Sequence, residues 1–506
     1  MTPTLPQPVE DFRSRVRSAI FWRSGSQIIA QMVMWMATII VVRLLDPKDY
    51  GLFAMTQVVL VAFNFLNGYS FATSLIQADS VDNRRIAQVF GMLILMNGGL
   101  AILQFLIAPV AAAYYGQPMV ADMLRVQCLL FLSTPFIALP SALLARRLDF
   151  RRQGLINLGS ALAGALTALG CAWFGLGVWT LVIAPIVMFS VRAIGLTIAA
   201  QLLVWPSFDF RGSGDVVRFG TALVLCQLFW IIQSQTDIFI AGRVLDPHNL
   251  GLYSESLFLT LIFTGRFIPP LNEVAFPAYA SLIKDQKPIA PAFITTARLI
   301  MLLAAPFYVG MSLTAAPLVT TLFGPKWLEM IPIVAGLAIA MPCMALQIMC
   351  SPATNALSRP RIYLRSSIAG AAIMPIAYVV GIQWGVQGLV RAWQVAAPLL
   401  LIATLSITLP VVGVRWRDLA RAMLPIGVAT LLMALSVAAA QWAMPAFAAP
   451  WQLALLVMVG GGVYALTLRL GWPALVGDLR DLLLRRETEV VTPAGQAPTS
   501  APPSTT

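Results

Sequence analysis

The stretch VVRLLDPKDYGLFA, residues 41–54, determines the expected architecture, because a related stretch, IAGRVLDPHNLGLYS, occupies residues 240–254. Six positions agree without a gap at a constant offset of 200 residues: Arg43 with Arg243, Leu45 with Leu245, Asp46 with Asp246, Pro47 with Pro247, Gly51 with Gly251 and Leu52 with Leu252. Proline after aspartate ends one helix, since proline lacks an N–H and restricts the residue before it. Each copy therefore predicts a tight turn between two long helices, and the repeat predicts a duplicated helical bundle.

The composition is that of a membrane protein. Of the 506 residues, 59% are hydrophobic and 11% are charged, and the mean hydropathy is +0.82. These values lie far outside the usual composition of soluble proteins. The apolar runs reach roughly 20 residues without the alternation of barrel strands, so they predict membrane-spanning helices. The expected fold class is an all-α polytopic membrane protein.

Apolar runs between breakers predict about fourteen transmembrane helices. The tail begins with an amphipathic pattern and ends in a Pro-, Ser- and Thr-rich stretch, which is typical of disorder. The expected organisation is a cytoplasmic N-terminal segment (1–20), a first six-helix bundle (21–204), a cytoplasmic linker (205–215), a second six-helix bundle (216–410), two C-terminal helices (411–472) and a cytoplasmic tail (473–506).

The basic residues predict the orientation. With a cytoplasmic N-terminus, 24 of the 33 Lys and Arg residues fall on the cytoplasmic side, and five fall inside the spans. The other side receives four, which are Arg43, Lys48, Arg243 and Lys326. This asymmetry follows the positive-inside rule. It predicts a multi-pass protein of the plasma membrane with both termini in the cytoplasm, and it explains the +12 net charge without nucleic acid.

The sequence offers little material for catalysis or metal binding. The five cysteines lie in apolar runs without CxxC spacing, which is typical of packing residues, and His248 is the one histidine. We therefore expect no metal, no cofactor and no enzymatic activity. A membrane-embedded glycosyltransferase or polymerase would need a carboxylate-rich outer loop, and the predicted outer loops are too short for one.

Ionisable residues inside the spans are the candidate site residues, because a charge in the bilayer usually faces a cavity or a partner. Glu255, Arg266 and Glu273 are separated by 11 and 7 residues, which puts them on one face of a helix. We expect this face to line a cavity. The alternative is that these charges neutralise one another or, for Glu255 in particular, lie at the membrane interface.

A polar stripe is predicted along the span of residues 216–243 by Gln227, Trp230, Ser234 and Asp237. Gln27 is the repeat counterpart of Gln227, so both halves present an amide at the same level. Asp237 has no acidic counterpart, since Ala37 occupies the matching position. It is either a carboxylate that couples transport to a proton or another cation, or a group that fixes its helix to a neighbour.

Four further arginines lie within spans: Arg125, Arg192, Arg298 and Arg391. Bases thus outnumber acids there, so a central cavity is expected to be cationic. Such a cavity suits a phosphate-bearing or acidic ligand, because guanidinium binds phosphate through paired hydrogen bonds. The alternative for the last three is that the side chain reaches to a membrane interface.

Several motifs resemble the bacterial Wzx-type polysaccharide flippases. They are RSGSQ at 23–27, VVRLLDPKDYGLFAMTQVV at 41–59, FATSLIQ at 71–77, TDIFIAGRVLDPHNLGLYS at 236–254 and RFIPPLNEVAFPAYASL at 266–282. The resemblance covers most of the chain in layout, and residues 20–80 and 214–285 in motif. It implies two six-helix bundles around a central cavity, with two extra helices, in the multidrug/oligosaccharidyl-lipid/polysaccharide exporter superfamily.

The same resemblance implies a substrate, an oligosaccharide repeat unit on undecaprenyl diphosphate, which moves between leaflets by alternating access. The resemblance implies that Arg266 lines the cavity and, less specifically, that Arg23 does so too. It also implies that the protein acts together with a polysaccharide polymerase and a chain-length regulator. Two alternatives share the fold: a multidrug and toxin extrusion antiporter, whose cavity should be rich in acids, and a peptidoglycan lipid II flippase.

Overall fold

The protein is described by a computed structural model. The backbone is described for residues 9–69, 71, 72, 75, 82–147, 149–202, 204–209, 214–357, 359–444, 448–473 and 477, and side chains from residue 25 onward except 214–227, 360 and 363. Within these ranges the chain forms helices and no strand. The predicted amphipathic and disordered tail lies almost wholly outside them.

The first part of the chain folds into α1 (Val9–Leu44), α2 (Pro47–Asn64), α4 (Asn83–Tyr115), α5 (Pro118–Ser133), α6 (Pro135–Arg146), α7 (Phe150–Trp173) and α8 (Trp179–Ala200). The second part folds into α9 (Gly214–Val244), α10 (Pro247–Lys284), α11 (Ala290–Leu313), α12 (Ala315–Leu322), the 3-10 helix η1 (Pro325–Met330), α13 (Ile331–Ile348), α14 (Cys350–Ala356), α15 (Pro360–Gly381), η2 (Ile382–Trp384) and α16 (Gly385–Val412). Two helices follow, α17 (Trp416–Ala443) and α18 (Ala449–Gly471). We call α1–α8 the first half and α9–α16 the second half.

The prediction of an all-α membrane protein with about fourteen spans is confirmed. Ten stretches of the described chain are long and apolar enough to cross a membrane, and one of them, Leu364–Val412, contains most of α15 and all of α16. The more polar helices α2, α9 and α10 cross the same layer. With α5–α6 and α13–α14 each taken as one crossing, the helices make 14 passages.

The predicted tight turns are present in both repeats. α1 ends at Leu44 and α2 begins at Pro47, while α9 ends at Val244 and α10 begins at Pro247. Proline is tolerated at the first helical position because that N–H has no partner within the helix. Asp46 and Asp246 take the extended N-cap conformation before these prolines.

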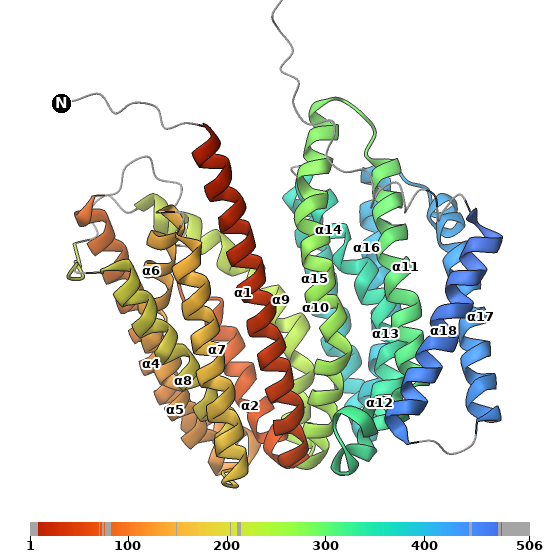
Figure 1. Ribbon diagram of the computed structural model, residues 1–506, viewed down its shortest axis with the longest axis horizontal. Helices are drawn as coiled ribbons and strands as arrows, with labels where there is room; N and C mark the ends of the chain where they lie inside the picture. Colours follow the sequence, from red (N-terminus) through yellow and green to blue (C-terminus); the bar gives the residue numbers. More distant parts are fainter. Residues whose placement is uncertain are drawn as a thin grey trace, which may run out of the picture.

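Both turns lie at the same end of the molecule, which we call the turn face. Figure 1 shows α1–α8 on one side and α10–α18 on the other; the two groups lie together at the turn face and diverge toward the opposite face, where α1 begins. α1 packs on α7 as α9 packs on α15, and α2 contacts α10 between the halves. α17 and α18 pack outside this pair, against α11 and α12.

One hydrophobic cluster joins the two halves at the turn face. It includes Val41, Tyr50 and Met55 of the first half together with Leu252 and Trp327 of the second. Burial of apolar surface on both sides of the junction stabilises the contact. The halves are therefore joined at the turn face by packed apolar side chains.

Candidate functional site

The two repeat glycines bring the backbones of the halves into close contact. A Cβ atom added at Gly51 would lie 1.8 Å from the carbonyl oxygen of Pro247, and one added at Gly251 would lie 1.8 Å from that of Pro47. Only glycine leaves room for backbone at this distance. The contact is reciprocal, as it is across a twofold axis. The repeated turns thus pack directly on each other.

The two repeat arginines cross between the halves in equivalent ways. Arg43 Nε donates to the carbonyl of Leu322 at 3.1 Å, and its guanidinium also donates to the carbonyl of Thr321. The guanidinium of Arg243 donates to the carbonyl of Tyr114 and lies 5.2 Å from the centroid of its ring. Each arginine thereby binds the carboxyl end of a helix in the other half, where a cation is favoured.

The segment at η1 adds contacts to the first repeat. Lys326 Nζ lies 2.7 Å from a carboxylate oxygen of Asp46 and donates to the carbonyl of Leu44 at 3.1 Å. The indole of Trp327 is fully buried; its Nε1 donates to the carbonyl of Val42 at 2.9 Å, and its ring meets Tyr50 edge-on at 5.3 Å. All of these contacts join the second half to the first.

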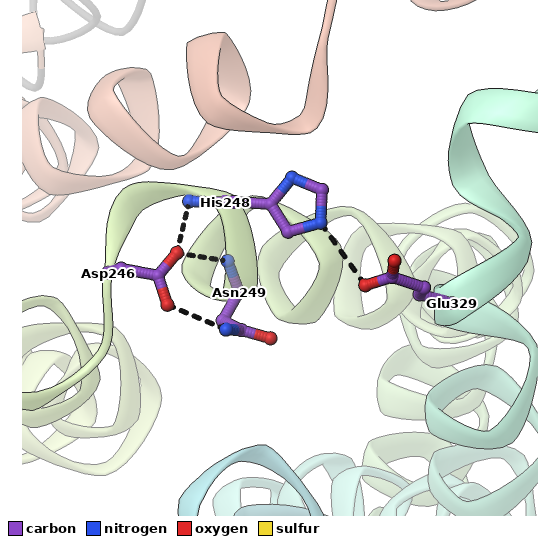
Figure 2. Close-up of polar contacts among 4 residues, drawn as sticks. All are labelled: Asp246, His248, Asn249 and Glu329. Carbon is purple, nitrogen blue, oxygen red and sulfur yellow. Dashed lines mark hydrogen bonds and ion pairs between the residues drawn. The ribbon is translucent and has the colours of Figure 1, made fainter.

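The second repeat uses its aspartate within its own helix. Asp246 accepts hydrogen bonds from the amides of His248 and Asn249 at 2.9 and 3.1 Å, and from Asn249 Nδ2 at 2.6 Å (Figure 2). His248 Nε2 lies 3.2 Å from a carboxylate oxygen of Glu329. Partial desolvation acts to raise the pKa of Asp246, but the hydrogen bonds from Asn249 and His248 together outweigh it, so the pKa lies below its usual value.

Three cavities lined by described residues lie behind this closed face. The first chamber has a volume of about 570 Å³ and is lined by Ser26, Gln27, Ala30, Gln31, Met34, Tyr69, Ala72, Ala138, Ser141, Ala142, Ala145, Phe150, Gln153, Gly154, Asn157, Ser160, Ala161, Met188 and Arg192. The second chamber, of about 440 Å³, is lined by α9, α10 and α13–α16. The interface cavity, of about 480 Å³, is lined by both halves.

The interface cavity adjoins each of the two chambers. The interface cavity shares Met34 and Met188 with the first chamber, and it shares Ser234, Leu257 and Leu261 with the second. Volumes of this size are typical of ligand pockets. The interior therefore offers one tract that runs from the first half through the junction into the second.

Some of the predicted site residues lie on this tract. Gln27 lines the first chamber, and Glu255 is the one charged residue among the described residues of the interface cavity. Arg266 is exposed on α10, beside Gly265 of the second chamber, and no hydrogen bond or ion pair to it is found in the described part of the chain.

The other predicted charged residues are dispersed. Arg125 lies near the turn face, 3.4 Å from Asp122 and over the ring of Phe105 at 5.6 Å. Arg298 is half-buried on α11, and its Nε has no partner. Glu273 is exposed on α10. The common helix face expected for Glu255, Arg266 and Glu273 spans a long helix, so the three do not meet in one pocket.

Asp237 is buried at the end of a hydrogen-bond chain. Trp393 Nε1 donates to the hydroxyl of Tyr253 at 2.8 Å, and that hydroxyl donates to Asp237 at 2.9 Å. The other carboxylate oxygen accepts from the amide of Ile238 at 2.8 Å. Trp393 also lines the second chamber, so the chain connects the carboxylate to that cavity.

The side chains of Arg23 and Gln227 lie outside the described residues. The repeat pairs Arg43 with Arg243 and Gly51 with Gly251, but only the structure shows that these residues join the two halves. Trp327 and Asn157 were not singled out, because neither belongs to the repeated stretch.

A protein-family model described as polysaccharide biosynthesis protein matches residues 40–332. The chain belongs to this family. The matched region begins just before the first turn and ends just after η1, so it contains both repeats and every contact that closes the turn face.

Relatives carry matching names. The chain is 24% identical to the teichuronic acid biosynthesis protein TuaB of Bacillus subtilis (strain 168), over 53% of this chain and 56% of the relative. It is 24% identical to the succinoglycan biosynthesis transport protein ExoT of Rhizobium meliloti (strain 1021), over 60% and 61%. It is 20% identical to the lipopolysaccharide biosynthesis protein WzxC of Escherichia coli (strain K12), over 65% and 67%. The matched part thus spans about three fifths of these relatives, and the resemblance to the Wzx-type family is confirmed.

Solved structures share the fold. The lipid II flippase MurJ in an inward closed conformation matches with a TM-score of 0.73 at 13% identity, over 90% of this chain and 100% of that one. An inward-facing multidrug resistance MATE family transporter of the MOP superfamily matches with a TM-score of 0.59 at 14% identity, over 76% and 94%. The protein is a multi-pass membrane protein with the fold of membrane transporters.

Proposed function

We propose that this protein is a flippase, not an enzyme, that moves undecaprenyl-diphosphate-linked oligosaccharide repeat units across the inner membrane for exopolysaccharide, capsule or O-antigen synthesis. The observation that carries the proposal is the tract of three adjoining cavities closed at the turn face by contacts between the halves. A tract closed at one end and flanked by diverging halves at the other is what one state of alternating access requires. The names of the relatives support the polysaccharide pathway.

The distribution of basic residues supports an orientation with the turn face outward and both termini in the cytoplasm. Described Lys and Arg residues at helix ends of the opposite face are Arg84, Arg85, Arg146, Arg147, Arg151, Arg152, Lys284, Lys287, Arg359, Arg361, Arg365, Arg415, Arg417, Arg421 and Arg469. The turn face carries Arg43, Lys48, Arg243 and Lys326, with Arg125 close by. By the positive-inside rule the opposite face is cytoplasmic. The cavities then receive the substrate from the inner leaflet.

Arg266 is the proposed contact for the substrate diphosphate in the second half. Arg266 is exposed and directly follows Gly265, which lines the second chamber, and no hydrogen bond or ion pair to it is found in the described chain. Arg298, whose Nε is buried without a partner, is a second candidate. A guanidinium matches the geometry of a phosphate oxygen pair.

Asp237 is the proposed coupling carboxylate. The chain from Trp393 through Tyr253 links it to the wall of the second chamber, so a change in that chamber can reach the carboxylate. The alternative is a structural role that fixes α9 to α10. Asp237→Asn keeps the size of the side chain, and transport that is unchanged at every pH and sodium concentration would leave only the structural role.

The deciding experiment measures undecaprenyl-diphosphate oligosaccharide, by amount and by leaflet, in cells that lack the protein and in cells that carry it or its Arg266→Ala variant. Accumulation on the cytoplasmic side that the intact protein relieves supports the flippase. Failure of the variant at equal expression supports Arg266 as a substrate contact. Lipid-linked sugar distributed identically with and without the protein would contradict the proposal. A polysaccharide polymerase and a chain-length regulator are the proposed partners, which co-purification from the same cells tests.

One observation favours a second function. Glu255 lies in the largely apolar interface cavity, and a carboxylate in apolar surroundings suits a hydrophobic cation. A multidrug cation antiporter would change drug sensitivity and leave lipid-linked sugar unaffected. A lipid II flippase, the third candidate, would instead cause lipid II to accumulate when the protein is removed, so the same cells separate all three.

A further inference from the structure

The first chamber differs from the rest of the tract in its chemistry. Its described lining combines Arg192 with the amide side chains of Gln27, Gln31, Gln153 and Asn157. Serine hydroxyls and Tyr69 complete the polar wall, and no acidic residue is among the described lining. The second chamber has no charged residue among its described lining, and the interface cavity has only Glu255. The first chamber is therefore the place on this tract that favours an anion.

No acidic side chain among the described residues neutralises Arg192. Its Nε is buried and has no hydrogen-bond partner, and no ion pair to it is found in the described part of the chain. It lies eight residues before the end of α8, about 12 Å along the helix from that end, so it is well inside the membrane layer. A charge at such a depth is costly to insert into a membrane, and it usually marks a ligand site or faces a partner.

Two more polar groups in the chamber have no partner. Asn157 Oδ1 and Ser141 Oγ are both buried and have no hydrogen-bond partner among the described residues. A buried polar atom without a partner costs free energy in the empty site. Asn157 Oδ1 can only accept a hydrogen bond, whereas Arg192 can only donate. A ligand that carries both an anionic acceptor and a hydroxyl donor can satisfy both groups.

We propose that the first chamber binds the anionic, hydroxylated head of the transported molecule, a sugar phosphate or a sugar acid, with Arg192 holding the anion and Asn157 and Ser141 holding hydroxyl groups. This inference rests on the proposed transport of a lipid-linked sugar and names the part of the protein that receives its head. Plain inorganic phosphate lacks the sugar hydroxyls, and a neutral sugar lacks the charge. The chamber thereby selects the combination of the two.

The test uses the full-length protein in nanodiscs of neutral lipid, with glucose 1-phosphate, glucuronic acid, glucose and inorganic phosphate as probes. Saturation-transfer NMR measures the weak dissociation constants. We expect one or both anionic sugars to bind at least about tenfold more tightly than glucose or inorganic phosphate. Tighter binding of glucose 1-phosphate would identify the bound anion as a phosphate. Tighter binding of glucuronic acid would identify it as the carboxylate of a sugar acid. Equal affinity for all four probes would overturn the site.

The variants separate binding from folding. Arg192→Gln should reduce the affinity for anionic sugars about tenfold, to that of glucose, and Arg192→Lys should fall between. Arg391→Gln, an exposed arginine on α16 that lines none of the three cavities, should leave every affinity unchanged. Because the unpaired guanidinium is costly in the empty chamber, Arg192→Gln should also raise the Tm without ligand. An unchanged affinity in Arg192→Gln, or a lowered Tm with loss of all binding, would overturn the role of Arg192.

Failure of this inference is distinguishable from failure of the proposed function. Arg192-dependent binding of anionic sugars by a protein that leaves lipid-linked sugar unmoved in cells would remove the flippase and keep the site. Transport in cells that Arg192→Gln and Asn157→Leu leave intact, with unaltered binding of the probes, would remove the site and keep the flippase.

Discussion

The two repeated turns share their sequence but use their aspartates differently. Asp46 forms a capping box with Asp49 and also reaches across the junction to Lys326 at 2.7 Å. Asp246 caps its own helix through His248 and Asn249, and its described contacts stay within that helix. The cause lies in the segment opposite each turn. The loop opposite the first turn reads Gly324-Pro325-Lys326-Trp327, and the one opposite the second reads Gly116-Gln117-Pro118-Met119. A duplicated motif therefore closes the turn face with equal backbone contacts and unequal side-chain contacts.

The largest expected effect comes from the indole that only one side possesses. Trp327→Ala removes a fully buried ring and its hydrogen bond to Val42, which should destabilise the protein by about 3–5 kcal/mol. Met119→Ala, in the loop opposite the second turn, removes a side chain that is 39% exposed and should change the free energy of unfolding by no more than about 0.5 kcal/mol. Unfolding in mild detergent measures both, and equal losses would contradict the asymmetry.

The backbone contact should respond symmetrically. Gly51→Ala and Gly251→Ala each force a methyl group against a carbonyl oxygen, which should cost about 1–3 kcal/mol and open the turn face. Spin labels at the exposed Phe174 and Leu328, in a background without native cysteines, should report a longer distance in both variants. Gly310→Ala is the control, because a Cβ there meets nothing within 4 Å. A longer distance in one glycine variant alone would contradict the reciprocal contact.

A smaller effect is expected for the exposed ion pair. A double-mutant cycle of Asp46→Ala with Lys326→Ala should give a coupling of about 0.2–1 kcal/mol, which weakens with added salt. The matching cycle of Asp246→Ala with Lys326→Ala should give none, since Asp246 is bound within its own helix. Coupling of similar size in both cycles would show that the two aspartates are equivalent after all.

The smallest effect is the pH dependence of Asp246. Its folded-state pKa is lowered, so the stabilisation is present above the unfolded value of about 3.9 and is lost as the pH falls through the folded value. As the pH falls, the Tm of the intact protein should therefore decrease more than the Tm of Asp246→Asn. Near neutral pH the free energy of unfolding of the variant should be lower by only about 0.3 kcal/mol, because Asn is also a good N-cap. Melting curves from pH 6 to pH 3 that superimpose for the two proteins would contradict the capping role.

Much of the fold could be predicted because it depends on local chemistry and on the bilayer. Proline at residues 47 and 247 breaks the helices wherever they pack, and long apolar runs must form helices in lipid because every backbone group needs an internal partner. The repeat at a constant offset likewise predicted two related halves. These features depend on the residues of each segment alone, so they can be predicted without knowing the tertiary contacts.

The site could be predicted only in part, because a charge in a span does not reveal what surrounds it. Arg125 and Arg192 were equivalent by sequence, yet one lies beside Asp122 near the turn face and the other lines the first chamber without a partner. Trp327 lies 285 residues from Val42 along the chain, and no local sequence pattern connects the two residues. The sequence by itself determined the fold class, the spans and the repeated turns, through local backbone restriction and hydropathy. Only the tertiary structure decided which charged residues line a cavity and which close the turn face. Those roles depend on distances between segments that lie far apart in the chain.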